Sequence, residues 1–202
     1  MPDTSFIENN ISNFKAIFIT HAHEDHVGSL THLFEYIEAP IYCGKFTALI
    51  AKSKISRGGG NTNLVKIVDH YPKLIKVGSF KVGFVNISHS IPEASGLVIE
   101  TPCSRIFHSG DFKVDHSPVL GKPFNNELLS KIGKKIFNTN EKINIVVATS
   151  GDTGSAAIAA LSNRKNINLF VLHPHNKISN IQRKIMTTIG GGNIYNLSLI
   201  HI

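Results

Sequence analysis

Three histidines and an aspartate stand within six residues near the start of the chain. They form the run His21-Ala-His23-Glu-Asp25-His26, which directly follows the apolar stretch 14–20. Imidazole and carboxylate groups are the ligands that hold zinc or manganese, and the end of a strand fixes such groups while leaving them open to substrate. In an extended turn His21 and His23 face one ion. Asp25 and His26 then fall on the other side, where a second ion fits, so the run predicts a metal site.

Two later segments end in residues of the same chemical type. Residues 80–89 alternate apolar and polar side chains, as a half-buried strand does, and they end at His89. Residues 96–101 and 105–111 read as two strands across a short turn, and the second ends at Asp111. Because strand ends can present ligands to one spot, we expect His89 and Asp111 to join the first cluster. His108 fits either a core position or a position behind the metal ligands.

Helix and loop patterns around these residues indicate an α/β unit. Apolar side chains recur at helical spacing over 27–37, so a helix is expected directly after the first cluster. A strand-to-helix junction also gives a site backbone N–H groups that point at it. Residues 118–140 contain Pro, Gly, Asn and Lys with a short helix at Leu128–Ile132, and we expect them to form a linker.

These motifs resemble those of a known family. The His-x-His-x-Asp-His run, the histidine of His89-Ser-Ile-Pro-Glu and the aspartate of His108-Ser-Gly-Asp-Phe-Lys are similar to the metallo-β-lactamase fold. The closer resemblance is to its ribonuclease J (β-CASP) branch, and it covers about residues 1–135. It implies an αββα fold, incomplete here because the family's opening strands, inserted RNA-binding domain and late histidine ligand are not found in this sequence.

The resemblance also implies the site and its chemistry. Zinc or manganese would occupy up to two sites, the second of them incomplete, and would hydrolyse RNA phosphodiesters, with Asp25 and Asp111 as catalytic carboxylates. RNA is the implied partner. The first ion would be held by His21, His23, His89 and Asp111, and the second by Asp25, His26 and the bridging Asp111.

The chain changes character after about residue 135. Residues 144–148 form a buried-strand run, a Thr/Ser/Gly turn then opens a helix of small residues, 168–173 form a second strand, and 178–188 have helical spacing. Strand, turn, helix, strand is a βαβ unit of an open parallel sheet. The turn can cradle a phosphate at the helix N-terminus, and it also suits any tight strand-to-helix connection.

A longer string in this part resembles a second family. Residues 148–157, followed by 172–179 and 182–188, are similar to threonine synthase over about 138–195. That family uses pyridoxal phosphate, and its Thr-Ser-Gly-Asp-Thr-Gly turn lies against the cofactor. The segment with the family's Schiff-base lysine is not found here, which argues against pyridoxal phosphate and against threonine synthase activity. The turn residues implicated by this resemblance are Ser150, Gly151, Asp152, Thr153 and Gly154.

We therefore expect an α/β chain of three parts. An incomplete metallo-β-lactamase fold (1–135) precedes a partial βαβ unit of a type II pyridoxal-phosphate fold (136–195) and an unrelated tail (196–202). Two partial domains in one chain indicate a chimera, because natural fusions join whole domains. The expected function is that of a ribonuclease J-type hydrolase, inactive in this form. The alternatives are another hydrolase on the same fold, threonine synthase, or a stranded fragment without activity.

Composition adds a few boundaries. The chain has 202 residues, 42% of them hydrophobic, and only two cysteines, which give neither a disulfide framework nor a metal-binding spacing. Without a signal peptide or a long apolar run, a cytoplasmic protein without membrane contact is expected. The formal charge of +7 is densest in residues 136–202, which hold 6 basic and 2 acidic residues, so charge does not support RNA binding by the first part. The sequence leaves the oligomeric state open.

Overall fold

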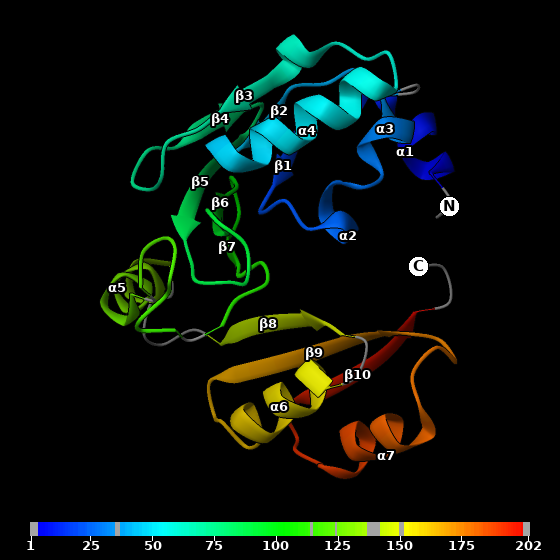
Figure 1. Ribbon diagram of the computed structural model, residues 1–202. Helices are drawn as coiled ribbons and strands as arrows, with labels where there is room; N and C mark the ends of the chain where they lie inside the picture. Colours follow the sequence, from blue (N-terminus) through cyan, green and yellow to red (C-terminus); the bar gives the residue numbers. More distant parts are fainter. Residues whose placement is uncertain are drawn as a thin grey trace. The chain divides into compact units, whose positions relative to one another are not determined.

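The computed structural model describes residues 4–34, 37–113, 115–123, 125–136, 142–149 and 152–199 of the chain (Figure 1). The chain divides into two compact units, one formed by Ser5–Ile136 and the other by Phe137–Ile202 together with Met1–Thr4. Both units combine helices with sheets, which confirms the predicted α/β class. None of the helices in the described ranges has the length and apolar character needed to cross a membrane.

The first unit contains two sheets. A parallel sheet has the strand order β1-β2-β3, and an antiparallel sheet has the order β4-β5-β6-β7. The strands are β1 (Ile17–Ile19), β2 (Ile41–Cys43), β3 (Val65–Ile67), β4 (Ile75–Val77), β5 (Phe80–Asn86), β6 (Ser95–Glu100) and β7 (Arg105–His108). The helices are α1 (Ser5–Asn9), α2 (Glu24–Val27), α3 (Leu30–Leu33), α4 (Lys45–Arg57) and α5 (Asn126–Ile136), with 3-10 turns at Ile11–Asn13 and Thr62–Leu64.

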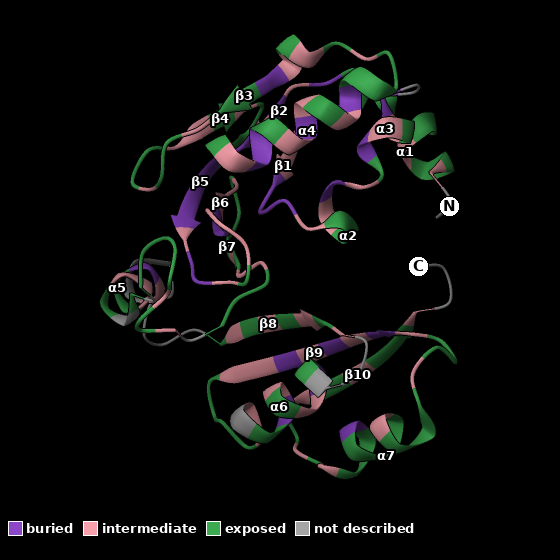
Figure 2. Ribbon diagram, viewed as in Figure 1, coloured by how far each residue is buried: buried purple, intermediate pink, exposed green. Residues whose placement is uncertain are grey.

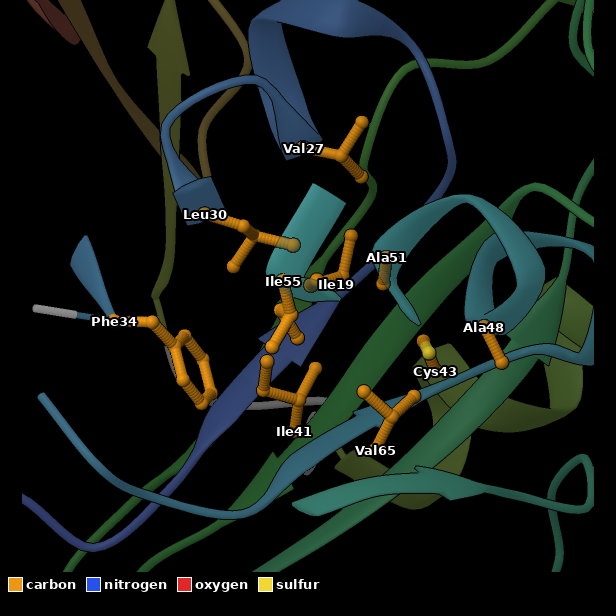
Figure 3. Packing of buried hydrophobic residues seen from close by; sticks show 10 residues of the cluster. All are labelled: Ile19, Val27, Leu30, Phe34, Ile41, Cys43, Ala48, Ala51, Ile55 and Val65. Atoms are coloured by element: carbon orange, nitrogen blue, oxygen red, sulfur yellow. The ribbon is translucent and has the colours of Figure 1, made fainter. Parts of the chain in front are cut away.

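Helices cover one face of the parallel sheet. Ile19, Ile41 and Val65 point from its strands toward Ala51 and Ile55 of α4, and all of them are buried (Figure 3). Small alanines on α4 let the helix approach the sheet closely, while the larger side chains of α2 and α3 fill the end of this layer. Burial of this apolar face stabilises the strand that leads into the His21 cluster.

The opposite face of the parallel sheet packs against the antiparallel sheet. Phe18 and Tyr42 stack with their ring centroids 5.3 Å apart, and Phe84 of β5 lies 6.2 Å from Phe18. Together with Val82 and Leu97 these side chains form one apolar cluster. The two sheets therefore share a core, and the ends of β1, β5 and β7 belong to one compact unit.

Helix α5 covers the outer face of the antiparallel sheet. Ile132 is only 3% exposed and packs in one cluster with Val85 and Val98. The layer order is thus helix, sheet, sheet, helix, as the predicted αββα fold requires. The expectation that 118–140 forms a linker is wrong for this helix, because Leu128, Leu129 and Ile132 form an amphipathic stripe that needs a partner.

The second unit is a three-stranded parallel sheet with two helices. Its strands have the order β10-β9-β8, and the buried Leu169 and Val171 of β9 pack against Ile158 and Met186 of the two helices. Figure 2 shows buried segments along β9. The predicted βαβ unit is confirmed by the parallel pairing of β8 with β9. The elements are β8 (Ile143–Ala148), α6 (Asp152–Leu161), β9 (Ile167–Pro174), α7 (Asn180–Thr188) and β10 (Ile194–Leu199).

Two segments differ in detail from the expectation. The helix expected over 27–37 is two short helices, α2 and α3, and Gly28 and Ser29 separate them. A Cβ on Gly28 would lie 2.5 Å from the Glu24 carbonyl oxygen, so this close turn requires glycine. Residues 194–199, which include the start of the expected tail, pair in parallel with β9.

Candidate metal centre

Three loops at the ends of β1, β5 and β7 are tied together by their backbones. Ser95 donates from its backbone N–H to the Thr20 carbonyl oxygen at 2.9 Å, and Lys113 donates to the Ser88 carbonyl at 2.8 Å. Gly110 adopts a φ of 60°, and a Cβ there would lie 2.8 Å from the Ser95 carbonyl oxygen and close to Thr20. Only glycine fits such a conformation in so small a space. These contacts place the loops that carry the candidate ligands beside one another.

The first group of candidate ligands contains three imidazoles. His21, His23 and His89 present ring nitrogens that all lie within 4.8 Å of one another. His23 Nδ1 is 3.1 Å from His21 Nε2 and 3.2 Å from His89 Nε2. The rings of His21 and His23 meet edge to face, as do those of His21 and His89. Three converging imidazoles from two loops form a donor set that could hold a metal ion.

The second group is centred on Asp111. Its Oδ2 atom is 3.4 Å from His26 Nε2 and 3.9 Å from the Nε2 atoms of both His21 and His89. His21, His26 and Asp111 also satisfy the 4.8 Å condition among their ligand atoms. One carboxylate oxygen therefore faces histidines of both groups. Asp25 lies at the edge, where its Oδ2 is 3.6 Å from His26 Nε2 and its side chain is mostly exposed.

The electrostatics of the centre keep the buried imidazole neutral. Burial, together with the neighbouring His26 and His89, lowers the pKa of His21 to about 4, while Asp111 acts in the opposite direction. Burial and His23 lower the pKa of His89 as well. An imidazole whose pKa is lowered is deprotonated at neutral pH, so its lone pair is free to bind a cation. The donor set thus fits a divalent ion.

Two further residues support His21 and Asp111: Thr20, which the sequence analysis did not single out, and His108. The buried Thr20 places its Oγ1 3.0 Å from His21 Nδ1, which leaves His21 Nε2 to face the other ligands. His108 is exposed, which contradicts the core alternative, and its Nδ1 accepts a hydrogen bond from the Gly110 N–H at 3.1 Å. That bond holds the turn on which Asp111 stands. In the sequence, the feature that could have indicated a supporting role for Thr20 is its position directly before His21.

A third residue, Glu93, anchors the loop that carries His89. Its Oε2 accepts a hydrogen bond from the Phe46 N–H at 2.6 Å, in the first turn of α4, and lies against Gly44. Glu93 has a φ of 58°, and its own carbonyl oxygen accepts from the Ser95 hydroxyl. A carboxylate at a helix N-terminus satisfies a free N–H and complements the helix dipole. The His89 loop is thereby fastened to the first helical layer.

The residues expected to approach pyridoxal phosphate are only partly described. Ser150 and Gly151 lie outside the described residues, and Asp152 begins α6. Thr153 is exposed. Gly154 is buried, its N–H donates to Thr149 Oγ1 at 3.0 Å, and a Cβ would lie 2.5 Å from Thr149 Cγ2. This glycine allows α6 to pack closely, so its presence in the turn has a structural explanation.

Comparison with known families assigns the first unit. The model of the beta-lactamase superfamily domain matches residues 3–126, which is more than half of the chain and includes all six candidate ligands. The chain belongs to the beta-lactamase superfamily. A ribonuclease J from Sinorhizobium meliloti is 36% identical over 135 residues, covering 67% of this chain and 24% of that protein. The predicted resemblance to ribonuclease J is thus confirmed. The 202-residue chain spans about a quarter of the length of the curated relatives it matches.

Solved structures give two further similarities. A diphosphatase from the PhnP family has a TM-score of 0.51 at 13% identity, over 98% of this chain and 74% of that chain, which is a likeness of fold alone. A threonine synthase from Brucella melitensis is 40% identical over a region covering 35% of this chain and 16% of that chain, with a TM-score of 0.30. The resemblance predicted from the sequence for the C-terminal part is to this same family.

Proposed function

We propose that the first unit is the metal-binding part of a hydrolase of the ribonuclease J type, which acts on RNA phosphodiesters. The observation that carries the proposal is the position of the Asp111 carboxylate, whose Oδ2 faces His21, His26 and His89 at 3.4–3.9 Å. A carboxylate shared by two groups of histidines is the arrangement that two closely spaced ions require. The 36% identity to a ribonuclease J supports RNA as the substrate class.

The two groups of ligands divide between two ions. His21, His23, His89 and Asp111 would hold the first zinc or manganese ion, and Asp25, His26 and Asp111 the second. When bound, such ions lower the pKa of water and stabilise negative charge on phosphoryl oxygens. The second set offers fewer imidazoles and includes the exposed Asp25, so we expect it to bind more weakly.

Side chains of the protein orient the candidate ligands, and burial keeps the imidazoles of His21 and His89 neutral. Thr20 hydrogen-bonds to His21 Nδ1 and so turns Nε2 toward Asp111. Burial of His21 and His89 keeps both imidazoles unprotonated near neutral pH. Asp111 is half exposed, so its carboxylate can contact a substrate while it offsets part of the positive charge of the bound ions.

The experiment uses an activated phosphodiester, because it needs little positioning by the protein. The 202-residue chain is stripped of metal, reloaded with zinc or manganese, and assayed for cleavage of bis(p-nitrophenyl) phosphate. We expect metal-dependent cleavage that Asp111→Asn lowers about a hundredfold, since it removes the shared carboxylate. The control is Asp69→Asn, which makes the same chemical change at an exposed aspartate paired with Lys73. Equal rates in both variants would contradict the proposal.

A second assay with 5′-labelled RNA addresses the substrate. The expectation from the sequence that RNA cleavage stays near background remains a prediction, since positioning of the scissile bond contributes much of such catalysis. Cleavage of RNA that is lost in Asp111→Asn would support the substrate class directly and would show that the inactive-fragment interpretation is wrong.

A further inference from the structure

A cavity of about 410 Å³ with a mixed polar and apolar lining lies in the second unit, far along the sequence from the candidate metal ligands. It is lined by residues from the end of β9, the following loop, helix α7 and strand β10. Figure 1 labels these helices and strands. The volume of the cavity falls in the range of sites that hold small molecules. The polar side chains of its lining include His173, His175, Arg183, Asn196 and Ser198.

Three of these side chains come from one face of the sheet. His173 of β9 stands directly opposite Ser198 of β10, and Asn196 lies two residues before Ser198. His173 follows Leu169 and Val171 at a spacing of two, so it shares the face on which these residues meet the helices. On this face, polar side chains therefore follow the apolar side chains of the core toward the carboxyl ends of the strands. Ligands of open parallel sheets bind at such strand ends.

Two atoms in this cavity are buried without a partner. Neither His173 Nδ1 nor Asn196 Oδ1 has a hydrogen-bond partner among the described residues, and His173 is only 7% exposed. The Asn196 amide is oriented by its Nδ2, which donates to the Met186 carbonyl oxygen at 3.1 Å. Its Oδ1 can only accept, so the cavity lacks a hydrogen-bond donor at this point. Buried polar atoms are nearly always paired, so these two atoms point to a bound group.

The charge of the lining is positive. Arg183 of α7 contributes a guanidinium, and in the described part of the chain no aspartate or glutamate lines the cavity. His175 Nδ1 and Ser198 Oγ are 2.9 Å apart and satisfy each other at the rim. A ligand in this cavity could donate a hydrogen bond to Asn196 Oδ1, pair with His173 Nδ1 as a donor or an acceptor, and place an anionic group beside the Arg183 guanidinium.

We propose that this cavity binds a small organic anion that also carries a hydroxyl or ammonium donor, such as a hydroxy- or amino-carboxylate. The carboxylate pairs with Arg183, and the donor group satisfies Asn196 Oδ1. His173 completes the site from the floor. If the cavity has a structural role only, water occupies it, and the protein binds no small organic anion there in preference to another solute.

Calorimetric titration of the full chain with four probes tests the proposal. Glycolate and L-serine carry both groups, acetate lacks the donor, and ethanolamine lacks the anion. We expect saturable binding of glycolate or L-serine and about tenfold weaker binding of acetate, because acetate leaves Asn196 Oδ1 unsatisfied. Arg183→Gln should weaken binding of the preferred probe about tenfold or more. His173→Leu should abolish it.

The control is Arg164→Gln, which removes the same charge from an exposed arginine of the same unit that does not line the cavity. Binding unchanged in Arg164→Gln and weakened in Arg183→Gln supports the site. Because Arg183 is exposed, this pair remains informative even if His173→Leu fails to fold. The proposal is overturned if neither glycolate nor L-serine saturates up to about 10 mM, if acetate binds equally well, or if both arginine variants behave alike.

Discussion

The two units handle the faces of their sheets differently. In the first unit each sheet is covered on both sides, so Val85 and Val98 of the antiparallel sheet meet α5 while Phe84 meets the parallel sheet. In the second unit the helices cover one face, and Val146 and Tyr195 point away from them with 61% and 44% exposure. Packing on both faces of a sheet helps to hold side chains at its strand ends in a fixed geometry. The candidate ligands of the first unit thus stand at the ends of strands packed on both faces, whereas the cavity of the second unit lies at the ends of strands that helices cover on one face.

The largest expected effect concerns helix α5, which completes the layers of the first unit. Ile132→Ala should lower the free energy of unfolding by about 2–5 kcal/mol, because the side chain is buried against Val85 and Val98. Urea unfolding measures this change, and the exposed Leu120→Ala should alter stability by less than about 0.5 kcal/mol. A loss at Ile132 as small as that at Leu120 would mean that α5 behaves as a linker.

Close packing of α6 on its sheet provides the next test. Gly154→Ala should destabilise the second unit by about 1–3 kcal/mol, because the new Cβ would lie 2.5 Å from Thr149 Cγ2 and 2.8 Å from Met186 Sδ. The matched change Gly133→Ala in α5 meets nothing within 4 Å and should stabilise its helix by up to about 1 kcal/mol. Thermal unfolding of both variants compares the two units directly. Stabilisation by both substitutions would show that α6 is loosely packed.

A smaller effect is expected from the anchor of the His89 loop. Glu93→Ala should weaken zinc affinity about tenfold, because the loop loses its hydrogen bond to the Phe46 N–H. Glu93→Gln keeps an acceptor oxygen and should retain most of the affinity. Competition with a chromophoric chelator measures both, with Glu127→Ala on the exposed start of α5 as control. If Glu93→Ala binds zinc as the native protein does, the loop needs no such anchor.

Much of the fold followed from short-range patterns. Alternating side chains over 80–89 predict β5, and residues 96–101 and 105–111 are predicted as two strands across a short turn. The structure has β6 and β7 there, paired antiparallel. The αββα class followed from the resemblance carried by His21, His89 and Asp111. The packing of α5 was not predicted. The Pro, Gly, Asn and Lys residues of 118–140 indicated a linker, although Leu128, Leu129 and Ile132 form an apolar stripe on this helix.

The supporting contacts of the site were harder to foresee. Glu93 reaches a partner 47 residues earlier in the chain, and nothing in the sequence around either residue marks that pairing. The parallel pairing of β10 with β9 also joins strands across the length of α7. Contacts of this kind depend on the assembled sheet, whereas the candidate ligands stand in short motifs whose chemistry is visible directly.

The central claim is that the histidines and Asp111 form a divalent metal centre. Elemental analysis of the purified full chain, after dialysis against metal-free buffer, tests it most directly. The account predicts about one zinc or manganese ion per chain or more, lost in His89→Ala and kept in His70→Ala, whose imidazole is exposed and lies outside the cluster. Metal contents that are equal in the native protein and both variants, or absent from all three, would contradict it.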